Sequence, residues 1–130
     1  MTSNLKKSIN NGLVPVIAPI GISKKQEYLN INADEVAGEV AQALGAEKLI
    51  LLTDVKGIGD SNKKLISKIS LSKGQKILKE KFIQGGMTPK LSAALEARGN
   101  GVRSCHIIDG RVPHAELLAV SYTHLRAHET

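Results

Sequence analysis

The stretch that decides the expected fold is LNINADEVAGEVAQALGAEKLILLTDVKGI, residues 29–58. After a polar opening, residues 33–44 carry apolar side chains at helical spacing, and Gly45 stands where a helix commonly ends. The next run, KLILL at 48–52, is apolar on both faces, as a central parallel strand is. The stretch therefore predicts a helix followed by a buried strand, with polar residues at both ends.

Working outward, the same patterns predict a chain in which strands and helices alternate. Such an order favours an α/β fold, a mostly parallel sheet with helices on both faces. The further predicted elements are a short helix at 5–10, a buried strand at 13–21, a polar loop at 22–28, an exposed excursion at 56–68, an amphipathic helix at 71–82, a glycine loop at 83–90, a helix from Pro89 to Gly99, a strand at 102–108 and a final helix at 112–120.

Composition narrows the class of protein. The 130 residues suit one domain, and 42% apolar content is too high for a disordered chain. The net charge of +6 favours anionic partners, but the lysines are scattered and only three residues are aromatic (one Phe and two Tyr), so nucleic-acid binding is not expected. No stretch is long enough to span a membrane, and a single cysteine excludes an internal disulfide, so a cytoplasmic location is expected.

Polar clusters follow each of the three main predicted strands. In an open α/β sheet, ligands gather at the carboxyl ends of the strands, so these clusters are expected along one edge around one cleft. Each also has a simpler interpretation, as a helix cap or an ordinary turn, and the residues alone leave both open. The clusters are Asn30, Asn32 and Asp34; Thr53, Asp54 and Gly57; and Asp109 and Arg111.

The segment GGMTPK, 85–90, offers backbone N–H groups and a lysine at the start of a helix, which suits a phosphate group. It matches neither a Walker loop nor a Rossmann fingerprint, and a generic glycine turn is the alternative. His106 and His114 have no Cys or carboxylate at zinc spacing beside them, so no metal site is predicted.

Together these motifs resemble a known family. YLNINADEVAGEVAQALGAEKLILLTDVKGI, GGMTPKLSAALEA and HIIDGRVPHAELL resemble the carboxyl-terminal half of the acetylglutamate kinases, in the amino acid kinase superfamily. The resemblance covers most of residues 13–118 and implies a partial three-layer sandwich of the carbamate kinase type. It implies transfer of the ATP γ-phosphoryl group, with Mg²⁺ bound to ATP, to the γ-carboxylate of N-acetyl-L-glutamate in arginine biosynthesis.

The resemblance also implies roles for particular residues. Lys90 would stabilise charge on the transferred phosphoryl group and Asp34 would orient lysines, while Asn30 and Asn32 would bind the acetylglutamate. The nucleotide would lie along Thr53, Asp54, Val55, Lys56, Gly57 and Ile58, with Phe82, Ile83 and Gln84 on its adenine side.

The sequence departs from the family pattern at both ends. The first strand, lysine and glycine-rich loop of the family are expected to be missing, so residues 1–120 are interpreted as a partial domain, the ATP-binding lobe, that is inactive alone. SYTHLRAHET, 121–130, is interpreted as a non-native tail, typical of read-through into an adapter. Full-length family members form homo-oligomers.

Two alternatives stay open at this point. One is another amino acid kinase, acting on glutamate, aspartate, carbamate or a nucleoside monophosphate, since these enzymes share the nucleotide lobe. The other is a basic nucleotide- or nucleic-acid-binding module without enzymatic activity.

Overall fold

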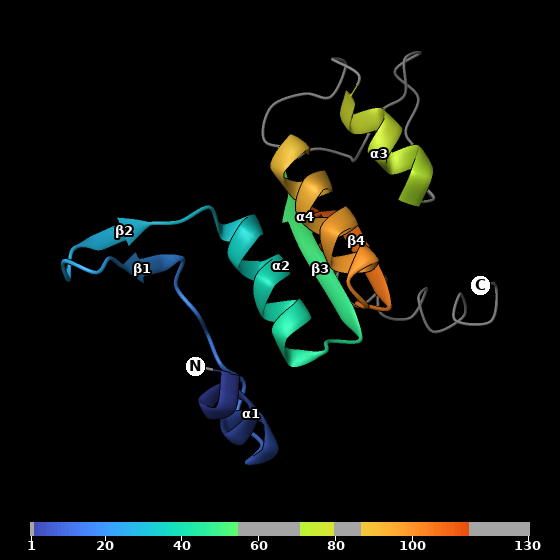
Figure 1. Ribbon diagram of the computed structural model, residues 1–130. Coiled ribbons are helices and arrows are strands. Elements are labelled where there is room, and N and C mark those ends of the chain that lie inside the picture. Colours follow the sequence, from blue (N-terminus) through green and yellow to red (C-terminus); the bar gives the residue numbers. More distant parts are fainter. Residues whose placement is uncertain (1, 55–70, 80–86, 115–130) are drawn as a thin grey trace.

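The computed structural model describes residues 2–54, 71–79 and 87–114. Its elements form two parts, an arm and a body (Figure 1). The arm holds α1 (Thr2–Asn10), β1 (Ile20–Ile22) and β2 (Tyr28–Asn30). The body holds α2 (Ala33–Leu44), β3 (Lys48–Thr53), α3 (Leu71–Lys79), α4 (Met87–Gly99) and β4 (Ser104–Asp109).

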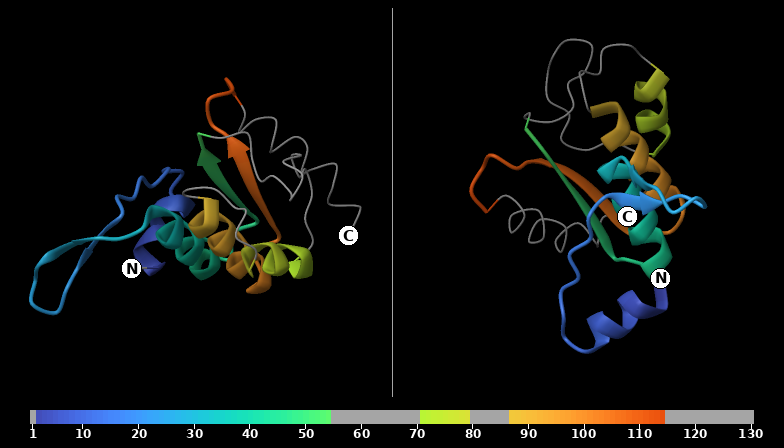
Figure 2. Two further views of the ribbon diagram at one scale, coloured as in Figure 1. Left: turned by 90° about the horizontal axis from the view of Figure 1, so that it is seen from above. Right: turned by 90° about the vertical axis from the view of Figure 1, so that its left-hand side faces the viewer.

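The body is built on a parallel pair of strands. β3 and β4 pair in register from Lys48 opposite Ser104 to Thr53 opposite Asp109. Because side chains alternate along a strand, Leu49 and Leu51 of β3 face the helices, where they are buried. Among the described residues, α2, α3 and α4 lie on this one face of the pair (Figure 2). The predicted α/β class with a parallel sheet is confirmed; a second helical layer is not among the described elements.

The predicted helix at 33–44 is confirmed with its bounds. Gly45 ends α2 in the left-handed conformation, with φ 62°, and its N–H bonds the carbonyls of Ala41 and Gln42. The most deeply buried positions on α2 are the small residues Gly38 and Ala41, not the larger valines. They face α4, whose Ala93, Ala94 and Ala97 are also buried, so the core between these helices is made of small side chains.

A second cluster joins α3 to α4 through Ile77, Met87 and Leu91, each at most 5% exposed. α4 therefore begins at Met87, earlier than the predicted start at Pro89, and residues 87–90 are helical rather than a loop. Burial of Met87 favours this longer helix. Pro89 is tolerated because the first turn of a helix has no intrahelical partners for its N–H groups.

The predicted buried strand at 13–21 is wrong. The arm runs through residues 13–19 without strand pairing, and Val14 and Val16 are 88% and 95% exposed. The strand β1 begins only at Ile20 and pairs with β2 in an antiparallel hairpin that projects from the body. An apolar run predicts burial only where another element covers it, and within the described part of the chain none does. The predicted polar loop at 22–28 is the turn of this hairpin.

The remaining boundaries agree in part. Helix 5–10 extends back to Thr2, and the strand predicted at 102–108 is β4, Ser104–Asp109. The final helix predicted from 112 does not begin in 112–114, which form a turn, and its other residues lie outside the described ranges. The predicted excursion at 56–68 and the end of helix 71–82 also lie outside them. No helix in the described ranges is both long enough and apolar enough to cross a membrane.

Candidate functional site

An ion pair between α2 and α4 forms the centre of the candidate site. Lys90 Nζ donates a hydrogen bond to Asp34 Oδ1 at 2.9 Å, although the two residues are 56 positions apart. Both side chains are largely enclosed, with 20% and 16% of their surface exposed. The sequence predicted that each residue stands at the start of a helix, and the structure brings the two into direct contact.

The position of this pair follows from the chain direction. In an α/β unit, helices run antiparallel to the strands, so the amino-terminal ends of α2 and α4 lie at the edge where β3 ends (Figure 1). Asp34 and Lys90 both stand in the first turn of their helices. A helix amino terminus attracts negative charge and disfavours a cation. The carboxylate of Asp34 is therefore well placed, and it compensates for the unfavourable position of Lys90.

The charges at this edge favour an anion. The ion pair is neutral overall, while the two helix termini add partial positive charge and the ammonium of Lys90 carries further N–H donors. A phosphoryl group that approached the pair would meet a fixed cation and oriented backbone dipoles. This is the arrangement that neutralises charge during phosphoryl transfer.

Packing of small residues brings the two helices close enough for the pair to form. A methyl group added at Gly38 would lie 3.5 Å from both the Cβ and the carbonyl oxygen of Ala93. Asp34 lies one turn before Gly38, so the close approach continues to the helix ends. At the other end of the helices, Asn100 Nδ2 donates to Gln42 Oε1 at 2.8 Å. Neither the Asn100–Gln42 hydrogen bond nor the role of Gly38 was among the sequence predictions; the facing small residues at helical spacing were the available signal.

The two asparagines predicted to bind substrate have different environments. Asn32 is the N-cap of α2, and its side-chain oxygen accepts hydrogen bonds from the N–H groups of Asp34 at 2.9 Å and Glu35 at 3.3 Å. The simpler interpretation of this cluster, a helix cap, therefore holds for the side-chain oxygen of Asn32. Asn30 ends β2, opposite Ile20, and is exposed on the hairpin four positions before Asp34.

The polar residues after β3 and β4 also come together. Thr53 is half-buried and pairs in register with Asp109, and Asp54 is exposed just beyond it. The N–H of Gly110 donates to the carbonyl of Thr53 at 2.8 Å. The prediction that these strands end at one edge of the sheet is confirmed. The other predicted nucleotide residues (Val55, Lys56, Gly57, Ile58, Phe82, Ile83 and Gln84) lie outside the described ranges.

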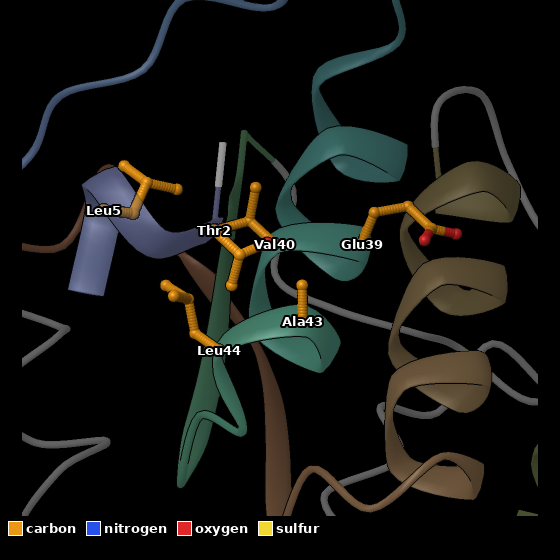
Figure 3. A pocket seen from close by; sticks show the side chains of 6 residues that line it. All are labelled: Thr2, Leu5, Glu39, Val40, Ala43 and Leu44. Atoms are coloured by element: carbon orange, nitrogen blue, oxygen red, sulfur yellow. The ribbon is translucent and has the colours of Figure 1, made fainter.

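A small apolar pocket lies elsewhere, between α1 and the carboxyl-terminal half of α2 (Figure 3). It encloses about 200 Å³, and only Thr2 and Glu39 bring polar groups to it. The other lining residues are Leu5, Val40, Ala43 and Leu44. It does not include the ion pair. Within the described ranges, no three His, Cys, Asp or Glu side chains gather as metal ligands do.

The sequence profile of the Amino acid kinase family matches residues 1–109. This chain belongs to the amino acid kinase family. The parallel strands, the helices on them and the polar residues at the strand ends are thus features of a member of that family.

Two curated relatives are named acetylglutamate kinase. The protein of Acinetobacter baumannii is 48% identical over 95% of this chain, and that of Marinomonas sp. (strain MWYL1) is 50% identical over 92%. The chain spans only about two fifths of their length, 41% and 39% respectively.

Two solved structures share the fold. The smu.665 protein of Streptococcus mutans UA159 matches 84% of this chain and 44% of its own, with a TM-score of 0.77 and 37% identity. N-acetylglutamate synthase of Neisseria gonorrhoeae, in complex with coenzyme A and N-acetyl-glutamate, matches 89% of this chain and 27% of its own, with a TM-score of 0.81 and 26% identity.

Proposed function

We propose that this chain is part of an acetylglutamate kinase, which transfers the γ-phosphoryl group of ATP to the γ-carboxylate of N-acetyl-L-glutamate. The observation that carries the proposal is the Lys90–Asp34 ion pair between two helix termini at the carboxyl edge of the strands. The relatives that bear this enzyme name are 48–50% identical to the chain, which supports the substrate. The related synthase structure, which holds N-acetyl-glutamate, supports the same ligand class.

The chemistry of the reaction suits this site. Phosphoryl transfer depends mainly on holding two reactants in line and neutralising their charge. A carboxylate with a pKa near ~4.3 is already ionised at neutral pH, so the reaction requires no general base. Asp34 is therefore assigned to holding the ammonium of Lys90, and Lys90 to stabilising charge on the moving phosphoryl group.

The other roles extend along the same edge. Asn30 and Asn32 are assigned to the acetylglutamate, with Asn32 also capping α2. Thr53 and Asp54, at the end of β3, are assigned to the nucleotide. Mg²⁺ is assigned to the phosphate oxygens of ATP, because it is usually bound through substrate phosphates and few protein carboxylates.

Calorimetry with MgADP and MgATP tests the nucleotide half of the proposal. The wild-type chain should bind both nucleotides. Lys90→Met should weaken MgATP binding by about tenfold, because it removes a charge-assisted hydrogen bond, and should weaken MgADP binding less, because ADP has no γ-phosphoryl group. Lys25→Ala, in the exposed hairpin turn, is the matched control and should bind like the wild type. An equal effect of Lys90→Met on both nucleotides would contradict its assigned contact.

Turnover is tested separately. We propose that the chain alone does not complete the reaction, since it spans 41% of the Acinetobacter relative. Incubation with MgATP and acetylglutamate, followed by trapping of acyl phosphate with hydroxylamine, should therefore give no hydroxamate above background. Hydroxamate formed by the chain alone would show that it carries a complete active site.

A further inference from the structure

The turn that follows β4 is held by one arginine. Arg111 Nε and Nη2 donate to the two carboxylate oxygens of Asp109, each at 2.9 Å, and the backbone N–H of Arg111 donates to Asp109 Oδ1 at 3.0 Å. This is a bidentate pair with a third bond that closes the turn, a geometry that fixes direction as well as distance. The carboxylate of Asp109 is only 16% exposed, whereas Arg111 is 58% exposed.

The same turn lies directly against the end of β3. Gly110 stands between Asp109 and Arg111 in the sequence, and its N–H donates a hydrogen bond to the carbonyl of Thr53 at 2.8 Å. A methyl group added at Gly110 would lie 3.3 Å from Leu52 Cβ and 3.5 Å from the carbonyl oxygen of Thr53. The turn is therefore in direct contact with the backbone of Thr53, the last residue of β3.

Arg111 also experiences the charge of Asp54, the residue that follows Thr53. The hydrogen bond to Asp109 raises the pKa of Arg111 most, followed by the charge of the same carboxylate. Desolvation opposes them, and the charge of Asp54 adds the weakest effect, which also raises the pKa. The guanidinium is therefore paired with Asp109, and Asp54 at the end of β3 acts on it only as a weaker, more distant charge.

We infer that Arg111 is a positioning residue for nucleotide binding, which holds the Thr53–Asp54 segment in place through Asp109 and the Gly110–Thr53 hydrogen bond. The inference rests on the proposed function and adds to it a residue that the sequence analysis left without a role. Arg111 acts here through its neighbours and is not assigned a contact with the reacting atoms.

Binding of MgADP and MgATP to Arg111→Ala tests the inference. Both dissociation constants should rise by about tenfold. Losses of this order are typical when a residue that orients a binding group, without touching the ligand, is removed. The two nucleotides should be affected equally, unlike in Lys90→Met, because Arg111 is not assigned to the γ-phosphoryl group. Amide hydrogen exchange at Gly110 should also become faster, since its acceptor segment is released.

Two variants separate positioning from charge and from general stability. Arg103→Ala removes an arginine at the opposite end of β4, where it pairs with Glu47 at 3.6 Å, and should leave both affinities unchanged. Arg111→Lys keeps the charge but cannot form the two parallel bonds, so it should bind nucleotide about as weakly as Arg111→Ala. Full recovery in Arg111→Lys would overturn the positioning role in favour of a simple charge effect.

The remaining outcomes separate the inference from the proposed function. If the wild-type chain binds nucleotide and Arg111→Ala binds it equally well, the inference is overturned and the proposed function stands. If the wild-type chain binds neither nucleotide, the nucleotide half of the proposed function fails and the inference fails with it. Hydrogen exchange tests the turn without nucleotide: if the amide of Gly110 exchanges equally fast in the wild type and in Arg111→Ala, Arg111 does not hold the turn.

Discussion

The arm and the body of this molecule contain similar apolar sequence but bury it very differently. Residues 13–17 of the arm read LVPVI, yet Val14 and Val16 are almost fully exposed. Residues 48–52 of the body read KLILL, and Leu49 and Leu51 are 7% and 4% exposed. The difference lies in the neighbours: β3 has β4 beside it and helices over one face. Apolar side chains favour burial, but they become buried only where another element packs against them.

The largest effect is expected from removing a core side chain of the body. Leu91→Ala, at a position 3% exposed between α3 and α4, should lower the free energy of unfolding by about 2–5 kcal/mol. Val16→Ala in the arm, at 95% exposure, should change it by less than about 0.5 kcal/mol. Urea denaturation followed by circular dichroism measures both. A large loss in Val16→Ala would show that the arm is covered in solution.

The next effect separates the enclosed ion pair from an exposed one. Lys90→Met leaves the carboxylate of Asp34 enclosed without its cation, and should cost about 1–3 kcal/mol. The pair Arg103–Glu47, more than 70% exposed on both sides, should contribute at most about 0.5 kcal/mol. Double-mutant cycles on the two pairs give both coupling energies. Equal coupling in the two cycles would contradict the view that the body encloses the Lys90–Asp34 pair.

A smaller effect is expected where the arm joins the body. Asn32→Ala removes the N-cap of α2 and should cost about 1 kcal/mol, because two backbone N–H groups lose their acceptor. Asn30→Ala, two positions earlier and exposed on the hairpin, should cost clearly less. Thermal unfolding of the two variants compares them. A larger loss in Asn30→Ala would place the boundary between arm and body within the hairpin.

The last effect concerns pH and reports on burial within β4. Burial raises the pKa of the Cys105 thiol to about 11, while the nearby Arg98 lowers it to a lesser extent. Because the folded state holds this proton more tightly than the unfolded state, the stabilisation is complete below the ordinary thiol pKa of 9.0 and is lost as pH rises towards 11. Stability should therefore fall between pH 9 and 11 more steeply in the wild type than in Cys105→Ala, measured by urea denaturation. Parallel curves would show that the thiol is solvated.

Local patterns were sufficient for much of the body. Helical spacing of apolar residues predicted α2 with its bounds, and Gly45 predicted its end, because both depend on interactions within a few residues. The same approach failed for residues 13–19, since burial of that run depends on a partner elsewhere. It also placed the start of α4 two residues late, because the buried contact of Met87 with α3 cannot be inferred from neighbours in sequence.

For the candidate site, the sequence alone determined which chemical groups stand at the strand and helix ends: Asp34 opens one helix, Lys90 opens another, and Thr53 and Asp109 end two strands. Only the tertiary structure decided which of them meet. Close packing of Gly38 against Ala93 brings Lys90 to Asp34, and Arg111 turns back onto Asp109 beside Thr53. The physical reason is that spacing along a chain fixes the face and end of an element, whereas a distance between elements depends on the side chains packed between them.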